Sequence, residues 1–271
     1  MPELPEVETT RKGIAPFVIG KTIKRIIVRQ PQLRWQVPEN LQKILVGARI
    51  NRLSRRAKYL LFHTNKGCLI MHLGMSGSLR LLTTEVAADK HDHADLVLST
   101  GNILRFRDPR RFGCMLWTDV EPGKHKLLQD LGPEPLSKYF NADYLYTLSR
   151  NRKIAIKNFI MNSHIVAGIG NIYASEILYL ADINPLRTTG RISRNGYEKI
   201  VNATRRVLSD ALKKGGTTLR DFVDSNGNPG YFRHELKVYD RAGQPCYKCK
   251  RPIKLIRQGQ RASYYCPNCQ H

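Results

Sequence analysis

Residues 59–82 read YLLFHTNKGCLIMHLGMSGSLRLL, and this stretch decides the fold class of the first half of the chain. It holds three short apolar runs. The first two are separated by Asn65-Lys66-Gly67, and a glycine-flanked segment at 74–77 precedes the third. Short runs of Leu, Ile, Phe and Tyr between such breaks are typical of β-strands joined by tight turns. The stretch therefore predicts consecutive strands.

Segments of the same kind recur on both sides of this stretch. They read TIKRIIV, ARINRL, DLVLS, ILRF and CMLW. With the first three they predict about eight strands between residues 20 and 120, at a spacing of about ten residues. Turn residues separate several of them, as at Ser99-Thr100-Gly101-Asn102. This pattern predicts a β-sandwich or a β-barrel.

The chain begins MPELPEVETT, with two prolines and three glutamates ahead of the first basic residue, Arg11. Proline is favoured at the first helical position and acidic residues in the first turn, so a helix is predicted over about residues 5–17. Pro2 and Glu3 precede that helix. The helix prediction gives these two residues no role.

The pattern becomes helical after Gly132-Pro133-Glu134-Pro135, which we interpret as a domain boundary. Apolar residues spaced by threes and fours predict a helix over 197–212, which Gly215-Gly216 would end. Another helix is predicted over 173–181. Residues 217–232 are rich in Gly, Asn and Asp and are predicted to form a loop.

The charge balance indicates the kind of partner. Lys and Arg number 45 against 22 Asp and Glu, which gives a net charge of +23. Such an excess predicts that the partner is a polyanion, of which nucleic acid is the commonest for a soluble protein. A membrane surface or the ribosome could use the same charge. No apolar run approaches the roughly 18 residues that a membrane span needs, and the acidic N-terminus is unlike a signal peptide. We therefore expect a cytosolic protein in a reducing compartment.

Four of the six cysteines form two C-x-x-C pairs near the C-terminus, Cys246 with Cys249 and Cys266 with Cys269. Two such turns on facing hairpins can present four thiolates to one tetrahedral zinc ion, and four thiolates leave no open position for catalysis. A pair of disulfides is the alternative, which a reducing compartment disfavours. Cys68 and Cys114 lie in apolar runs and are predicted to be buried thiols.

Two turns carry residues suited to a nucleic acid. Gly168-Ile169-Gly170-Asn171 precedes a predicted helix, where it is either a tight turn with an asparagine N-cap or a phosphate site made by free backbone amides. Asp108-Pro109-Arg110-Arg111-Phe112-Gly113 is either an ordinary hairpin tip or a device that enters a duplex, with an apolar wedge and an arginine that reads base edges.

Two further signals are weaker. Met75, between two glycines, is either a second wedge or a core residue, and its residue type favours the core. His91-Asp92-His93 lacks the further ligands that a metal site needs. We interpret its histidines as polar loop residues or a phosphate contact.

Taken together, the motifs resemble the formamidopyrimidine-DNA glycosylase family over essentially the whole chain. The matching stretches are PELPEVET, SRRAKYLL, HLGMSGSLR, DPRRFG, GIGNIYASE, GGTTLRDF and the terminal cysteine module. The related endonuclease VIII enzymes typically begin PEGPE, whereas Leu4 occupies the glycine position here. This detail and the start of the 217–232 loop favour the purine-specific enzyme.

The resemblance implies an α+β fold in three parts. Residues 1–130 would form a catalytic β-sandwich domain with an N-terminal helix. Residues 131–232 would form a helix-two-turns-helix DNA-binding domain with a lesion-capping loop at 217–232, and residues 233–271 a zinc-ribbon finger. The implied protein is a bacterial, cytoplasmic, nucleoid-associated monomer that needs one structural Zn²⁺ and no organic cofactor. Its partner would be double-stranded DNA with oxidised purines or abasic sites.

The resemblance also implies the chemistry. Removal of Met1 would leave Pro2 with a free secondary amine that attacks the deoxyribose C1′, expels the damaged base and forms an iminium. An α-amino group titrates near 8 and a lysine near 10.4, so far more of the former is free base at pH 7. Glu3 would be the acid/base residue that protonates the sugar oxygen, and strand cleavage by β- and δ-elimination would follow.

The remaining site residues are implied by the same resemblance. Glu6 would orient the damaged nucleotide, and Lys58 and Arg261 would act within the catalytic group as phosphate contacts. Met75, Arg110 and Phe112 would fill the gap left by the flipped nucleotide and read the opposite cytosine. Arg220 stands in the capping loop where some relatives carry lysine. The other implied DNA contacts are His72, His91, Asn171 and Tyr239.

Two other functions remain open at this stage. An endonuclease VIII-like glycosylase would remove oxidised pyrimidines with the same architecture. A non-catalytic zinc-ribbon protein that binds RNA or the ribosome would show the same charge and cysteines. That second alternative gives no role to Pro2 and Glu3.

Overall fold

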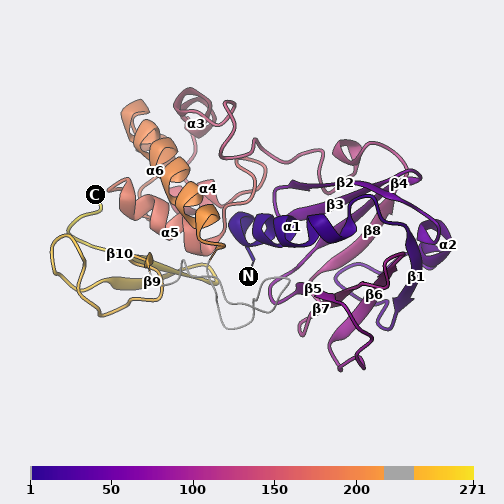
Figure 1. The fold of residues 1–271 in the computed structure, drawn as a ribbon. Helices are drawn as coiled ribbons and strands as arrows, with labels where there is room; N and C mark the ends of the chain where they lie inside the picture. Colours follow the sequence, from indigo (N-terminus) through magenta and orange to yellow (C-terminus); the bar gives the residue numbers. More distant parts are fainter. Residues whose placement is uncertain (1, 217–234) are drawn as a thin grey trace. The chain divides into compact units, whose positions relative to one another are not determined.

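The computed structural model describes residues 2–216 and 235–271, which form two compact units. The described part of the first unit comprises residues 2–130 and 214–216, and that of the second comprises 131–213 and 235–271. Figure 1 shows strands and helix α1 in the first unit, and helices α3 to α6 with one hairpin in the second. Residues 217–234, and with them Arg220 and the predicted capping loop, lie outside the described residues.

Eight strands of the first unit form two antiparallel sheets, so the predicted sandwich is confirmed and the barrel alternative is wrong. One sheet has the order β1-β6-β7-β5 and the other β2-β3-β4-β8. The bounds are β1 Ile23–Val28, β2 Ile50–Arg56, β3 Tyr59–Thr64, β4 Gly67–His72, β5 Ser78–Leu82, β6 Asp92–Leu98, β7 Ile103–Arg107 and β8 Cys114–Thr118. The helical segments are α1 Leu4–Val18, α2 Leu41–Leu45 and the 3-10 turn η1 Pro122–Lys124.

Helix α1 shares the apolar core between the sheets. Val7, Ile14 and Val18 recur at helical spacing on its buried face and belong to the same buried cluster as Phe62 of β3 and Phe106 of β7. Removing this much apolar surface from water is the main force that fixes α1 against the sheets. The predicted helix over 5–17 is confirmed, and its first turn is held by a core on which the whole unit depends.

Strands β3 and β4 lie within residues 59–82, the stretch whose apolar runs predicted consecutive strands. Strand β3 pairs with β4 so that Thr64 lies opposite Gly67 and Tyr59 opposite His72. The two residues between Thr64 and Gly67 make the tight turn that the sequence predicted. This register places Lys58, which follows β2, at the same end of the sheet as His72.

The second unit is helical, as its apolar spacing predicted. Its elements are α3 Ala142–Ser149, α4 Ile156–Ile160, α5 Asn171–Leu180, the 3-10 turn η2 Thr189–Arg191, α6 Arg194–Lys213, and the strands β9 Lys254–Gln258 and β10 Arg261–Tyr265. Tyr197 on α6 is fully buried, and its ring meets that of Phe159 edge-on at 6.3 Å. Strands β9 and β10 pair as an antiparallel hairpin.

The two isolated cysteines are buried, as predicted. Cys68 on β4 and Cys114 on β8 have almost no exposed surface. Burial raises the pKa of each thiol to about 12. Among the described residues, no helix combines the length and apolar character that crossing a membrane would require.

Candidate active site

The N-terminus of α1 is buried. Pro2 is buried, and only 1% of the surface of Glu3 is exposed. Glu3 and Glu6 form a capping box, in which the Glu6 carboxylate accepts a hydrogen bond from the Glu3 backbone N–H at 2.8 Å. A chain end that would ordinarily fray is therefore held in one position. This gives Pro2 and Glu3 the role that the helix prediction alone could not supply.

Gly216 lies against this N-terminus. A Cβ placed on Gly216 would stand 2.7 Å from Oε1 of Glu6, and the backbone has φ +83°. Only glycine fits without strain, because both the space and the left-handed conformation exclude a side chain. From sequence, Gly215-Gly216 had been given only the role of ending a helix. The paired glycines were the available signal for this close approach.

Lys58 lies in the tight turn between β2 and β3. Arg56 pairs with Tyr59 across the two strands, which leaves Ala57 and Lys58 as the turn residues. Lys58 is half-buried, and Ala57 is buried with φ +53°. The turn thus presents one basic side chain from a fixed backbone.

His72, at the end of β4, is a neutral imidazole at pH 7. Burial, followed by the charges of Lys58 and Arg34, lowers its pKa to about 3. Its Nδ1 accepts a hydrogen bond from the backbone N–H of Gly74 at 2.8 Å. A neutral ring that accepts at Nδ1 carries its proton on Nε2, so His72 can donate one hydrogen bond to an anion without bringing a charge.

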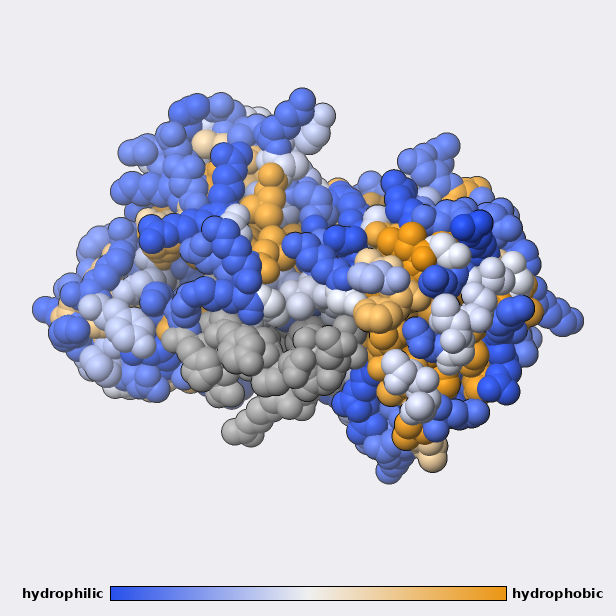
Figure 2. Space-filling model, in the orientation of Figure 1, coloured by the Kyte–Doolittle hydropathy of each residue, from blue (hydrophilic) through white to orange (hydrophobic). Residues whose placement is uncertain are grey.

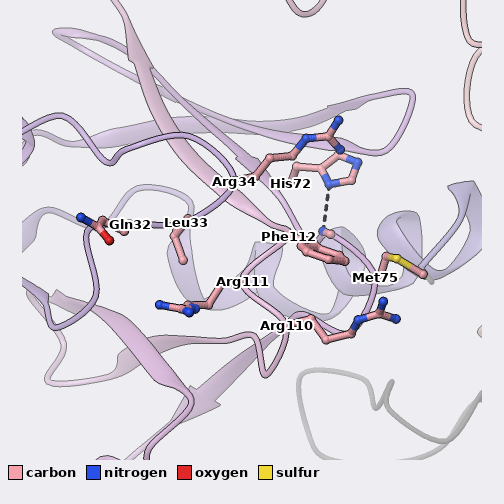
Figure 3. A pocket seen from close by; sticks show the side chains of 9 residues that line it. Gln32, Leu33, Arg34, His72, Met75, Arg110, Arg111 and Phe112 are labelled. Carbon is pink, nitrogen blue, oxygen red and sulfur yellow. Dashed lines mark hydrogen bonds between the residues drawn. The ribbon is translucent and has the colours of Figure 1, made fainter.

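A pocket of about 750 Å³ brings together Met75, Arg110 and Phe112, the residues implied to fill the vacated space, with His72, one of the implied phosphate contacts (Figure 3). Met75 and Phe112 are 38% and 43% exposed, so the core interpretation of Met75 is wrong. The Arg110 guanidinium lies over the Phe112 ring at 4.9 Å from its centroid. The lining residues are Gln32, Leu33, Arg34, His72, Gly74, Met75, Arg110, Arg111 and Phe112.

The turn that carries Arg110 and Phe112 is organised by Asp108. The carboxylate of this fully buried residue accepts hydrogen bonds from Ser76 Oγ at 2.9 Å and from the Gly113 N–H at 2.8 Å. One carboxylate thus joins the turn of Met75 to the turn of Phe112. The sequence reasoning missed this role of Asp108, although an aspartate that begins a Pro-containing turn is a known signal for side-chain capping of the backbone.

Of the two histidines interpreted as polar loop residues, His93 lies instead in strand β6, so that interpretation is wrong for it. Asp92 begins strand β6, and both Asp92 and His93 are buried. Nε2 of His93 hydrogen-bonds the Asp108 carbonyl at 2.7 Å, which supports the turn described above. His91 is half-buried in the turn before β6 and keeps its place as a candidate phosphate contact.

In the second unit, Asn171 is the first residue of α5 and not its N-cap, because Gly170 occupies the cap position. The interpretation of Asn171 as an asparagine cap is therefore wrong. Its side-chain Oδ1 is buried and has no hydrogen-bond partner within the described protein. Buried polar groups are nearly always paired, and the two ends of an amide exchange by a simple flip, so this side chain fits a polar ligand at the helix N-terminus.

Tyr239 is fixed from two sides within the second unit. Its backbone N–H donates to the buried Glu176 carboxylate at 2.8 Å, and so do those of Lys237 and Val238 at 2.8 and 2.9 Å. Its ring packs on Tyr264 of β10 with centroids 5.0 Å apart. Burial raises the pKa of Glu176 while the three N–H donors oppose that shift. Glu176 gave no sequence signal beyond its place in GIGNIYASE.

Arg261 opens β10 and is exposed at the tip of the β9–β10 hairpin. The strand behind it is held by a buried lysine, since Lys157 Nζ donates to the Ala262 carbonyl and to Ser263 Oγ, both at 2.8 Å. Basic residues outnumber acidic ones among the exposed charged side chains of this module, and Figure 2 shows a largely hydrophilic face around β9 and β10. This surface suits a phosphate backbone.

The four clustered cysteines fit a zinc ion. Their Sγ atoms all lie within 4.8 Å of one another, with Cys249 to Cys266 at 3.4 Å and Cys246 to Cys269 at 3.9 Å. Zn–S bonds of about 2.3 Å in a tetrahedron place sulfur atoms about 3.8 Å apart, so the geometry matches a structural Cys₄ site. Tyr179 Oη lies 3.4 Å from Cys246 Sγ and joins α5 to this module. In the part of the chain that the structure describes, no other metal-ligating cluster occurs.

Three segments of the chain match known protein families. Residues 1–115 match the formamidopyrimidine-DNA glycosylase N-terminal domain, residues 131–223 the helix-two-turns-helix (H2TH) domain of the same enzymes, and residues 243–271 a zinc finger found in FPG and IleRS.

Individual relatives match over their full length. The chain is 54% identical over 270 residues to a formamidopyrimidine-DNA glycosylase of Syntrophotalea carbinolica, and the match covers 100% of both chains. Two solved structures of Lactococcus lactis Fpg, one with Fapy-dG DNA and one with abasic-site DNA, are each 32% identical to it. Each has a TM-score of 0.93, with 99% of both chains covered.

Proposed function

The chain belongs to the formamidopyrimidine-DNA glycosylase family, and from this premise we propose how its residues remove a damaged base and cut the strand. It is a DNA glycosylase of base excision repair with abasic-site lyase activity. Its substrates are 8-oxoguanine and formamidopyrimidines in duplex DNA. The observation that carries the proposed mechanism is the buried Pro2–Glu3 pair at the capped N-terminus of α1.

Pro2 is the nucleophile in this mechanism. After removal of Met1, its secondary amine attacks C1′ of the damaged nucleotide, and the new N–C1′ bond replaces the glycosidic bond as the base leaves with the electron pair. Glu3 supplies the proton that opens the sugar ring at its oxygen. As the amine bonds to C1′ it gives up its own hydrogen, which leaves with the expelled base. The product is an iminium whose nitrogen carries no hydrogen, so it cannot become a neutral imine by losing a proton from nitrogen.

The iminium also accounts for strand cleavage. It withdraws electrons from C1′, so a proton at C2′ becomes acidic and its loss expels the 3′ phosphate. A second elimination then expels the 5′ phosphate. Base removal and cleavage of both phosphate bonds thus follow from one covalent intermediate, and no oxidant or reductant is needed.

The damaged nucleotide must leave the helix before the sugar can be attacked. We assign Met75, Arg110 and Phe112 to the space it vacates, because they project from rigid turns into one pocket (Figure 3). Arg110 is the residue that would read the opposite base, since its fork of donors matches base edges. Glu6 orients the flipped nucleotide from the first turn of α1.

Phosphate contacts come from both units in this proposal. Lys58 and Arg261 would contribute positive charge at the phosphates, whereas His72 would donate a hydrogen bond from a neutral ring. Asn171 would contact phosphate together with the backbone N–H groups at the start of α5. Tyr239 and His91 are the remaining phosphate contacts of the proposal. Arg220 and the loop at 217–232 are proposed to cover the flipped base, and they lie outside the described residues.

The relatives support this assignment through the DNA that their structures contain. The two Lactococcus lactis complexes hold Fapy-dG and abasic-site DNA. An RNA- or ribosome-binding zinc-ribbon protein without catalysis would leave the buried N-terminal pair without a role. We further propose that the protein acts as a cytoplasmic monomer on nucleoid DNA, with one zinc ion that holds the C-terminal hairpin.

The proposed function is tested by borohydride trapping. Duplex DNA with 8-oxoguanine opposite cytosine should give a covalent protein–DNA adduct, because borohydride reduces the iminium to a stable amine. Duplex with an oxidised pyrimidine should give a slower reaction, and a faster one would favour the endonuclease VIII-like specificity. If the protein binds the 8-oxoguanine duplex but yields neither adduct nor cut strand, the proposed function is wrong.

A further inference from the structure

We propose that Arg55 is a positioning residue for Lys58 and that Glu8 on α1 holds Arg55 in this role. The inference rests on the proposed function, which gives Lys58 a contact with the DNA at the lesion. The three residues Glu8, Arg55 and Ala57 are called the Glu8–Arg55–Ala57 bridge below. It connects the helix that carries the nucleophile to the turn that carries Lys58.

The guanidinium of Arg55 binds Glu8 and the turn in different directions within the described part of the chain. Its Nε donates to Glu8 Oε2 at 3.0 Å, and its Nη1 donates to the Ala57 carbonyl at 2.7 Å. The Arg55 and Glu8 side chains are only 13% and 15% exposed. Water screens such a pair less than it screens a surface ion pair, and the planar fork of arginine fixes both partners at once.

The carbonyl of Ala57 belongs to the peptide group that joins Ala57 to Lys58. Ala57 has φ +53°, a left-handed conformation that alanine adopts only at a cost, and it is 3% exposed. Such a conformation persists only when the surroundings hold it. The Arg55 Nη1 bond is therefore placed to fix the peptide plane from which Lys58 departs.

The other end of the bridge lies on α1. Glu8 follows Glu3 by five residues and Glu6 by two, and those two residues cap the same helix. Burial opposes the ionisation of Glu8, but its hydrogen bonds and charge interactions with Arg11 and Arg55 outweigh burial and lower its pKa. An ionised Glu8 thus ties the backbone that positions Pro2 to the backbone that positions Lys58, so both groups share one rigid frame.

Arg11 offers a matched control. It also binds Glu8, with its Nε and Nη2 3.0 and 2.7 Å from Oε1, but its Nη1 donates to the Leu53 carbonyl at 3.3 Å and not to the turn. Arg55→Lys and Arg11→Lys make the same chemical change beside the same carboxylate. Both keep the net charge, so neither changes the overall attraction to DNA.

The test measures single-turnover excision of 8-oxoguanine at saturating enzyme for Arg55→Lys, Arg11→Lys, Lys58→Ala and the double variant Arg55→Lys with Lys58→Ala. A misplacement of about 1 Å can slow an enzyme about a hundredfold, so we expect Arg55→Lys to be about ten- to a hundredfold slower. Arg11→Lys should stay within about twofold of the wild type. In the Lys58→Ala background the Arg55→Lys change should add less than about twofold, because residues that act through one another are not additive.

Two outcomes would overturn the inference. One is an Arg55→Lys excision rate equal to that of Arg11→Lys, and the other is a double variant whose fold loss in rate equals the product of the losses of Arg55→Lys and Lys58→Ala. Glu8→Gln keeps an acceptor but removes the charge, and should show a smaller loss that also vanishes in the Lys58→Ala background. If Arg55→Lys folds poorly, Glu8→Gln tests the inference in its place. A wild-type protein that excises nothing would instead contradict the proposed function, which separates the two failures.

Discussion

The Glu6 carboxylate accepts a hydrogen bond from the backbone N–H of Glu3 at 2.8 Å, and both residues are 1% exposed. A second acid in the helix thus holds the backbone of the first. The proposed acid/base residue and the residue that orients the nucleotide are therefore parts of one capping structure, and changing one should disturb the other.

Glu6→Ala removes this hydrogen-bond acceptor, whereas Glu6→Gln keeps an oxygen at the same place. Loss of an N-terminal cap costs about 0.5–2 kcal/mol, so the unfolding free energy should fall by about that amount in Glu6→Ala and by less in Glu6→Gln. Trapping should slow more in Glu6→Ala as well, because the N-terminus is less well held. Denaturant unfolding and trapping rates measure both effects, and equal losses in the two variants would contradict the capping role.

Gly216→Ala should impair excision by pressing on Glu6. The added Cβ would stand 2.7 Å from Glu6 Oε1, at a backbone φ of +83°. Gly101→Ala is the matched control, because Gly101 has φ +87° and nothing within 4 Å of the added Cβ. Both variants should lose about 1 kcal/mol of stability from the left-handed backbone, but only Gly216→Ala should slow the trapping reaction. Equal trapping rates would show that the contact with Glu6 has no effect on the site.

Acid should destabilise the folded protein through His72. Its pKa is lowered from 6.5 to about 3 in the folded protein, mainly by burial. Below pH 6.5 the unfolded chain takes up a proton at this residue, whereas the folded chain does so only near pH 3, so the unfolding free energy should fall across this window. His72→Gln should show a pH dependence weaker by about one proton in urea unfolding between pH 6 and 4. Parallel curves for the two proteins would contradict the neutral assignment.

Arg261→Ala should weaken binding to every DNA sequence alike. A side chain that contacts phosphate reads no base, and loss of one such contact lowers the slope of log K against log salt by about one. Arg25→Ala removes the same charge from β1, where Arg25 lies 3.6 Å from the exposed Glu85, and should leave the slope unchanged. A loss confined to particular sequences would contradict the phosphate assignment.

Much of the fold was predictable from local sequence patterns. The strands of the opening stretch were predictable because β3 and β4 pair through a two-residue turn, so the sequence neighbours are also the neighbours in the sheet. The zinc module was predictable for the same reason, since each C-x-x-C pair is a local unit. Helices α5 and α6 followed from the spacing of apolar residues.

Contacts between residues distant in sequence were not predictable. Arg55 and Glu8 are separated by 47 positions, and nothing local distinguishes their ion pair from ordinary surface charges. Asp108 joins two turns 32 positions apart through its bond to Ser76. His93 was misplaced because a histidine beside an aspartate is typical of a loop, whereas its burial depends on β1 and β7, which pair with β6 on either side. The exposure of Met75 was not predictable from its residue type, which favours a core, because the turns around it decide that exposure.

The central claim is that Pro2 forms the covalent bond to DNA. The most direct measurement is peptide mapping by mass spectrometry of the borohydride-trapped adduct formed with an 8-oxoguanine duplex. The account predicts that Pro2, as the first residue of the processed chain, carries the deoxyribose remnant, and that a protein with an extra residue ahead of Pro2 binds the duplex without being trapped. A remnant on Lys58, or trapping that survives the extra residue, would contradict it.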